Sequence, residues 1–192
     1  MKKEYSGATS FIITVVLICV GVYLLDFMTP GSLRHYGLLP RNTNYMFGIF
    51  TYPFLHGSSS HLIGNMVSFS VLAYLVSRLR HQRLITVFVI SWLLSGAAVW
   101  VFGRSSMHIG LSGVIYGLWA YLIVYGLMYR SLKSIFISVV VMIFYGSMVW
   151  GVFPINRWVS FESHLFGALA GALSGYLFAK QDDRRDLKQQ RR

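Results

Sequence analysis

Six apolar runs, each long enough to cross a bilayer as a helix, leave this chain few possible folds. A hydrocarbon core about 30 Å thick needs roughly 20 residues of helix, and only helices and closed barrels satisfy their backbone hydrogen bonds in lipid. The runs therefore predict an all-α polytopic membrane protein with six transmembrane helices. In order, the runs occupy residues 9–28, 55–77, 84–103, 112–129, 133–153 and 161–179.

The composition supports this interpretation. Of the 192 residues, 55% are hydrophobic and only 12% are charged, about half the charged fraction of a soluble domain. The connections between runs are short, and we find no internal repeat, so we expect one membrane domain over residues 1–192, with a basic tail at 180–192. No small-x-small cleavage site follows the first run, which we therefore take as a helix and not as a signal peptide. The single cysteine, Cys19, excludes a disulfide framework and a cysteine-based metal site.

The distribution of positive charge predicts the orientation in the membrane. If the N-terminus is cytoplasmic, thirteen of the 17 Lys and Arg residues fall on the cytoplasmic side, as the positive-inside rule requires. These thirteen are Lys2, Lys3, Arg78, Arg80, Arg83, Arg130, Lys133, Lys180, Arg184, Arg185, Lys188, Arg191 and Arg192. The other side holds Arg34, Arg41, Arg104 and Arg157. We therefore expect both termini in the cytoplasm, contacts with anionic membrane lipids, and no nucleic-acid partner.

The fourth run opens on a serine in an unusual setting. Ser112 follows Gly110-Leu111 and precedes Gly113, and glycine lets the backbone turn sharply and lets another group approach closely. The first amides of a helix have no intrahelical partner, so they can stabilise negative charge. The pattern suits a serine nucleophile. The alternative interpretation is a capping serine on an ordinary membrane helix.

Two other runs place polar side chains at the same depth. His61 and Asn65 lie four residues apart on one face of the second run, and His164 lies at the start of the sixth. Because the second, fourth and sixth runs all enter from the outer face, these side chains share one level with Ser112. Tyr116 lies one turn below Ser112 on the same face of the fourth run. Each residue also has another interpretation: His61 and Asn65 could form hydrogen bonds between helices, His164 could relay protons, and Tyr116 could be a core aromatic.

Serine hydrolysis gives one chemical reason for the whole set. Ser112 as a nucleophile needs a base, which His164 can provide. The oxyanion that forms needs hydrogen-bond donors, which His61, Asn65 and the amide of Ser112 can supply. Metal-dependent hydrolysis is disfavoured, because no HExxH is present and carboxylates are few. We expect no metal and no cofactor.

Small residues predict which helices touch. The sixth run carries glycines at steps of four, a pattern that lets another helix pack closely. If that neighbour is the fourth run, His164 meets Ser112 at the outer end of the contact. Alternatively, the glycines of the sixth run could form a dimer face. The glycines expected to pack the helices are Gly113, Gly117, Gly167 and Gly171.

The sequence also predicts that no carboxylate orients His164. Glu162 is the one acidic residue close to it in the sequence. Two residues on a helix differ by about 200° around the axis, so the two side chains diverge. We expect His164 to be held instead by packing against Tyr116.

These residues together resemble a known family. The segments His56-x4-His61-x3-Asn65, Gly110-Leu111-Ser112-Gly113-x2-Tyr116 and His164-x2-Gly167-x3-Gly171 are similar to those of the rhomboid intramembrane serine proteases, and specifically the compact bacterial members. The resemblance covers the second to sixth runs. It implies a six-helix bundle, a serine–histidine dyad, no cofactor, and a multi-pass protein of a bacterial inner membrane.

The resemblance also implies a role for each matched residue. Ser112 resembles the nucleophile and His164 the general base, while His61 and Asn65 resemble the pair that stabilises the oxyanion. Tyr116 resembles the tyrosine that stacks on the catalytic histidine. Family substrates are usually single-span membrane proteins, cut within or near the bilayer. One departure is that Phe47-Gly48 occupies the position where many members carry Trp-Arg in the first outer loop, which is also short here.

The sequence thus predicts an intramembrane serine endopeptidase that uses a Ser112–His164 dyad. Two alternatives belong to other functional classes. The first is a catalytically silent rhomboid-like protein that binds membrane clients, and the second is a small proton-coupled transporter that uses His61 and His164 as relays. The substrate, its cleavage site and the oligomeric state are left open.

Overall fold

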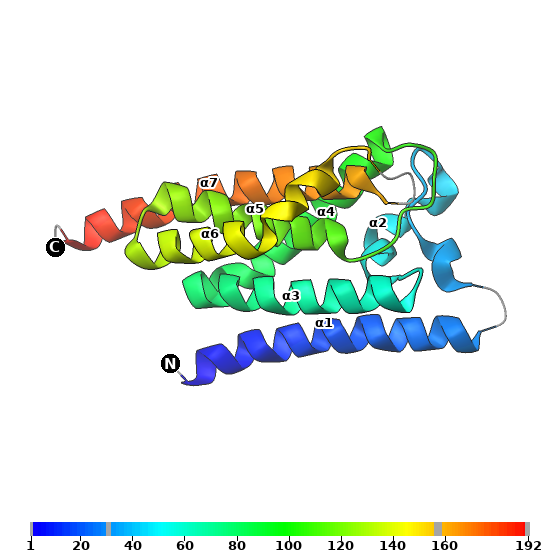
Figure 1. The fold of residues 1–192 in the computed structure, drawn as a ribbon, viewed down its shortest axis with the longest axis horizontal. Helices are drawn as coiled ribbons and strands as arrows, with labels where there is room; N and C mark the ends of the chain where they lie inside the picture. The colour runs from blue at the N-terminus through cyan, green and yellow to red at the C-terminus, as the bar shows by residue number, and fades with distance from the viewer. Residues whose placement is uncertain (1, 30–31, 156–158, 191–192) are drawn as a thin grey trace.

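The chain is a bundle of helices, seen in a computed structural model that describes residues 2–29, 32–155 and 159–190 (Figure 1). The longer helices are α1 (Lys2–Met28), α3 (Ser59–Arg80), α4 (Leu84–Phe102), α5 (Ser112–Tyr129), α6 (Leu132–Tyr145) and α7 (Phe161–Gln190). A short helix, α2 (Gly48–Thr51), and several 3₁₀ turns lie in the connections. Within the described residues there is no β-strand, only an isolated bridge between Leu38 and His108. The all-α prediction is confirmed.

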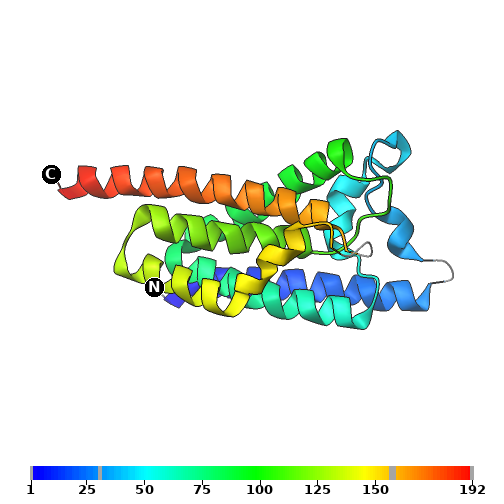
Figure 2. The ribbon, with the colours of Figure 1, turned by 45° about the horizontal axis from the view of Figure 1, so that its top comes forward.

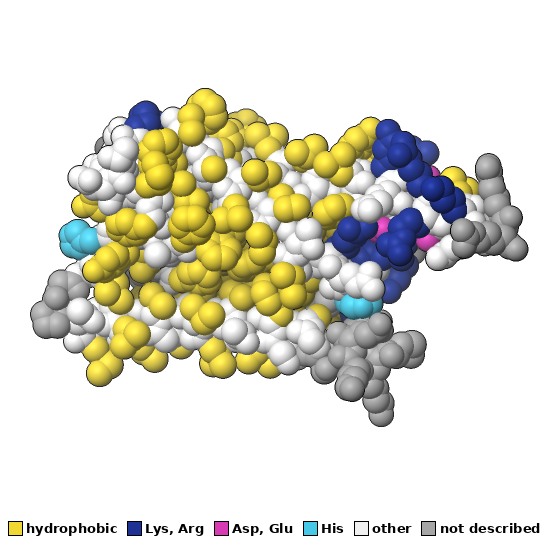
Figure 3. Space-filling model, turned by 180° about the vertical axis from the view of Figure 1, so that it is seen from behind, with side chains coloured by type: hydrophobic (Ala, Val, Ile, Leu, Met, Phe, Trp, Pro, Cys, Tyr) yellow, Lys and Arg dark blue, Asp and Glu magenta, His cyan; other side chains and the backbone are white. Residues whose placement is uncertain are grey.

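The surface of the bundle is suited to lipid. Among the residues that the structure describes, four stretches are long and apolar enough to cross a membrane: Gly7–Met28, Ser59–Phe102, Ser112–Tyr129 and Leu132–Val152. The second of these contains both α3 and α4, joined by a single 3₁₀ turn. Large apolar side chains such as those of Phe136 and Phe144 are exposed on the outside. Figure 3 shows hydrophobic side chains covering the middle of the molecule, with most of the visible Lys and Arg at one end.

Helix α5 lies at the centre, in contact with α3, α4, α6 and α7. Its closest neighbour is α7, and the glycines explain why. A side chain at Gly167 would overlap the carbonyl oxygen of Gly113, and one at Gly171 would overlap that of Gly117. The two backbones therefore touch directly, as small residues at a membrane-helix interface allow. The glycine face of α7 is occupied by α5 of the same chain, which leaves it no room for a dimer contact.

Several helix boundaries differ from the prediction, and the first is that α1 begins at Lys2 and not at residue 9. The second run was expected to be helical from residue 55, but α3 begins at Ser59, because the Ser58 hydroxyl accepts a hydrogen bond from the His61 amide and caps the helix. The fifth run was expected to be helical to residue 153. Helix α6 instead ends at Tyr145, and the chain continues as a 3₁₀ helix over Gly146–Val152.

The basic tail is not a separate segment but the last part of α7. Helix α7 was expected to end near residue 179, yet it runs unbroken to Gln190 and projects beyond the other helices (Figure 2). Both chain termini lie at this end of the bundle (Figure 1). The predicted outer residue Arg157 and the tail residues Arg191 and Arg192 lie outside the described residues.

Candidate active site

Ser112 and His164 face each other where α5 and α7 begin. The distance from Ser112 Oγ to His164 Nε2 is 2.9 Å. On its other side, His164 Nδ1 lies 2.9 Å from the backbone carbonyl oxygen of Gly151. A carbonyl oxygen only accepts hydrogen bonds, so Nδ1 carries the proton and Nε2 is left to accept one from the serine hydroxyl. The histidine is therefore held in the tautomer that a general base needs.

Aromatic packing fixes the plane of the same imidazole. The Tyr116 ring lies one turn below Ser112 on α5 and stacks on the His164 ring, with centroids 4.1 Å apart and planes 9° apart. The Tyr116 hydroxyl packs directly on Gly151, where any side chain would overlap it. His164 is thus held by a ring on one face and by a backbone carbonyl at Nδ1.

The backbone before Ser112 brings α3 into the cluster. Gly110 has φ +112°, a conformation that favours glycine, and its amide donates to the carbonyl oxygen of Tyr52 at 2.8 Å. A side chain on Gly110 would lie 2.6 Å from His61 Cε1 and 3.4 Å from Asn65 Nδ2. His61 and Asn65 therefore pack against the turn that leads into Ser112.

Asn65 has a partner that the sequence reasoning missed. Its Nδ2 lies 3.0 Å from His56 Nε2, and His56 Nδ1 lies 3.4 Å from the Phe54 carbonyl oxygen. Because that carbonyl accepts a hydrogen bond from Nδ1–H, His56 Nε2 is unprotonated and accepts a hydrogen bond from the Asn65 amide. This contact orients the amide and leaves its second N–H for another acceptor. His56 is only 2% exposed and belongs to the cluster.

These side chains open into one cavity of about 980 Å³. It is lined by Ser112, His164, His61, Asn65 and Tyr116, together with apolar side chains that include those of Met107 and Met148. Such a space is large enough for a peptide segment and for water. All five residues singled out as catalytic or supporting therefore reach a common space, although they come from three different helices.

A second polar network lies behind the dyad. The buried Glu162 carboxylate accepts a hydrogen bond from the Arg104 amide at 3.2 Å and lies 3.4 Å from Arg104 Nε. Arg104 Nη2 also donates to the Val159 carbonyl oxygen at 2.6 Å. His108 is 1% exposed, and its Nδ1 lies 2.6 Å from Ser160 Oγ. These contacts join the loop before α5 to the segment before α7.

Sequence signals for these supporting residues were weak or absent. His108 stands out only as a histidine near Gly110, and its partner is 52 residues away. Gly151 acts through a carbonyl that every residue type possesses. Neither contact could be found before the two loops were placed side by side.

Glu162→Gln is expected to keep most of the activity that a Ser112–His164 dyad supports. The carboxylate faces Arg104, and the His164 Nδ1 proton already has an acceptor at Gly151. A glutamine oxygen can still accept from the Arg104 amide, so the fold should persist. The rate of cleavage at saturating substrate tests this. A loss of about a thousandfold with normal folding would instead identify Glu162 as a third catalytic group, since removing an orienting carboxylate from a triad costs about ten-thousandfold.

Comparison with known proteins places the chain in a family. A model of the rhomboid domain matches residues 43–181, which include the whole cluster described above. The chain is 33% identical over 182 residues to an uncharacterized protein of Mycobacterium bovis, covering 90% of this chain and 75% of that protein. An uncharacterized protein of Mycobacterium tuberculosis has the same identity and coverage. An uncharacterized protein of Mycobacterium leprae is 33% identical over 177 residues, which cover 88% of this chain and 70% of that protein. The chain is an integral membrane protein that belongs to the rhomboid family.

Proposed function

We propose that this protein is an intramembrane serine endopeptidase that cleaves transmembrane protein substrates within or near the outer part of the bilayer. The observation that carries the proposal is the 2.9 Å contact between Ser112 Oγ and His164 Nε2, with the histidine in the accepting tautomer. Membership of the rhomboid family supports it, because that family is typically one of intramembrane serine proteases.

The reaction follows from these positions. Ser112 Oγ attacks the scissile carbonyl carbon while its proton passes to His164 Nε2. The oxyanion that forms accepts hydrogen bonds from the free Asn65 N–H, from the Ser112 backbone amide and from His61. His164 then gives its proton to the departing amine. A water molecule in the cavity, activated by the same imidazole, hydrolyses the acyl-enzyme and restores Ser112.

We further propose how the protein lies in its membrane. Helices α1, α3, α4, α5 and α6 and residues 161–179 of α7 would form six spans, with both termini on the cytoplasmic side of a bacterial inner membrane. Both termini are at one end of the bundle, and Ser112 and His164 begin helices that start at the other end. The positive-inside bias of the sequence supports the orientation. Cysteine accessibility at the two ends in intact cells would test it.

Asn65→Ala is expected to slow cleavage by about a hundred- to a thousandfold, because one oxyanion donor is lost while the amide of Ser112 and His61 remain. The effect should fall on the catalytic rate more than on apparent substrate affinity. Steady-state kinetics on a membrane substrate would measure it. If Asn65→Ala lowers the melting temperature but spares the rate, then Asn65 serves only to join α3 to its neighbours.

Gly151→Ala is expected to reduce the rate by roughly a hundredfold, the cost of displacing a catalytic group by about 1 Å. The new methyl group would overlap the Tyr116 hydroxyl and push the ring stack and the carbonyl apart. Gly146→Ala is a suitable control, because a side chain there would meet nothing within 4 Å. Equal rates for the two variants would show that the contact between Gly151 and His164 is not needed.

The proposal is tested by reconstitution. Purified protein in liposomes should cut a labelled single-span protein whose membrane segment carries small, weakly helical residues. A client-binding protein would retain this substrate uncut, and a transporter would instead carry protons across vesicles without cutting it. Proton flux with no cleavage would overturn the proposal in favour of the transporter, and binding with no cleavage in favour of the silent protein.

A further inference from the structure

One face of α7 changes from apolar to cationic along its length. Leu169, Leu173 and Leu177 are 56%, 52% and 51% exposed, and they follow one another at steps of four. The same face continues into the exposed cations Lys180 and Arg184, since steps of three and four residues return to one side of a helix. An apolar track on the surface therefore runs directly into a pair of positive charges.

The cations of this face border a groove of about 420 Å³. No acidic side chain lines it, and the exposed Asp183 is not among its lining residues. Lys180 Nζ lies 5.8 Å from the centroid of the Tyr176 ring, which directs the ammonium back toward the apolar part of the helix. The groove is lined by Leu177, Lys180, Gln181, Arg184, Arg185 and Lys188.

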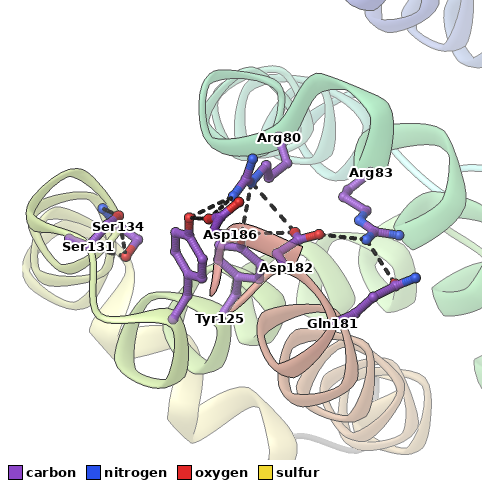
Figure 4. Close-up of polar contacts among 9 residues, drawn as sticks. Arg80, Arg83, Tyr125, Ser131, Ser134, Gln181, Asp182 and Asp186 are labelled. Carbon is purple, nitrogen blue, oxygen red and sulfur yellow. Dashed lines mark hydrogen bonds and ion pairs between the residues drawn. The ribbon is translucent and has the colours of Figure 1, made fainter. Parts of the chain in front are cut away.

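Ion pairs on the opposite side of α7 hold this face outward. Asp182 is 4% exposed; its Oδ1 accepts from Arg83 at 2.8 Å and its Oδ2 from the Tyr125 hydroxyl at 3.1 Å (Figure 4). Asp186 lies 3.3 Å from Arg80 Nη2. The acidic side chains therefore face the protein, where arginines from the α3–α4 connection neutralise them. This fixes the rotation of α7 about its axis and leaves its cations unneutralised toward the surroundings.

The change from apolar to cationic side chains along α7 falls at the depth of lipid headgroups. A helix rises about 1.5 Å per residue, so Lys180 lies about 5 Å and Arg184 about 10 Å beyond Leu177. The polar region of a bilayer adds about 5–8 Å on each side of the hydrocarbon core. If Leu177 lies at the edge of the hydrocarbon core, Lys180 falls within this region, and the long side chain of Arg184 can reach back into it.

We propose that this face of α7, hereafter the stripe, binds an anionic phospholipid, with an acyl chain along the three leucines and the phosphate between Lys180 and Arg184. The inference concerns a surface at the opposite end of the helix from His164 and does not depend on the proposed protease function. Apolar chain and anionic headgroup in one molecule match the two halves of the stripe. A soluble anion would use only the second half.

The test is lipid retention by the whole protein. The protein in detergent is loaded with phosphatidylglycerol or phosphatidylcholine, and the bound lipid is counted by native mass spectrometry. A cation near an anionic surface contributes about fivefold in affinity, so Lys180→Gln with Arg184→Gln should weaken phosphatidylglycerol binding by roughly thirtyfold. The charge-conserving pair Lys180→Arg with Arg184→Lys should retain it.

A matched control removes the same charge from the same end of the bundle. The control variant is Arg130→Gln with Lys133→Gln, where α5 ends and α6 begins; neither residue lines the groove. It should leave phosphatidylglycerol binding within about twofold of that of the unchanged protein. An equal loss in both double variants would overturn the site and leave only general attraction. Equal binding of phosphatidylcholine, or displacement of the lipid by millimolar inorganic phosphate or glycerophosphate, would also overturn it.

Discussion

Ser112→Ala should abolish cleavage of a membrane substrate while leaving the bundle folded. Losing the serine nucleophile of a hydrolase can lower the rate by about a millionfold, whereas a serine hydroxyl at a helix start contributes only about 1 kcal/mol to stability. His164→Ala should be about as severe, because Ser112 Oγ and His164 Nε2 form one unit at 2.9 Å. The double variant should be no worse than either single one.

Rates in liposomes and melting curves of the same preparations would measure these effects together. Normal melting with no cleavage is the expected pair of results. Turnover near that of the unchanged protein in either variant would show that the dyad is not the catalytic group. A collapse of the melting curve in Ser112→Ala would show that the serine is a structural residue.

Gly171→Ala should separate α5 from α7 and so remove both stability and activity. The added methyl group would overlap the carbonyl oxygen of Gly117, which belongs to a backbone and has little freedom to move away. Overpacking of this kind costs about 1–3 kcal/mol or more. A shift of about 1 Å between the helices that carry Ser112 and His164 would cost roughly a further hundredfold in rate.

The matched control is Gly21→Ala on α1, where a side chain would meet nothing within 4 Å. It should melt and cleave like the unchanged protein. Melting temperature, rate and oligomeric state of the two variants would be compared. If Gly171→Ala stays active and stable but changes the oligomeric state, the glycine face serves an assembly and the contact with α5 is not critical.

The parts of the site that the sequence predicted share a physical cause. Ser112 and His61 lie in the first turn of their helices and Asn65 in the second turn of α3, and a run of apolar residues locates a helix start to within a few positions. The bounds of α5 agree with the predicted run at 112–129. Glycines at steps of four indicate close packing without any knowledge of the partner helix, so the meeting of α5 and α7 could be expected as well.

The parts that could not be predicted depend on contacts between loops. His56 reaches Asn65 only because α3 starts at Ser59, after a capped turn that hydropathy does not detect. The Gly151 carbonyl reaches His164 because α6 gives way to a 3₁₀ helix at Gly146. The length of α7 was underestimated, because its charged end looks like a tail until Asp182 is paired with Arg80 and Arg83.

The most direct test of the dyad is covalent labelling by a fluorophosphonate, followed by mass spectrometry of the labelled peptide. This reagent reports an activated serine and requires no knowledge of the substrate. One adduct is expected, on Ser112, and it should be lost in His164→Ala while labelling persists in Glu162→Gln. Absence of an adduct on a folded protein, or an adduct that forms equally well without His164, would contradict the proposal that His164 activates Ser112.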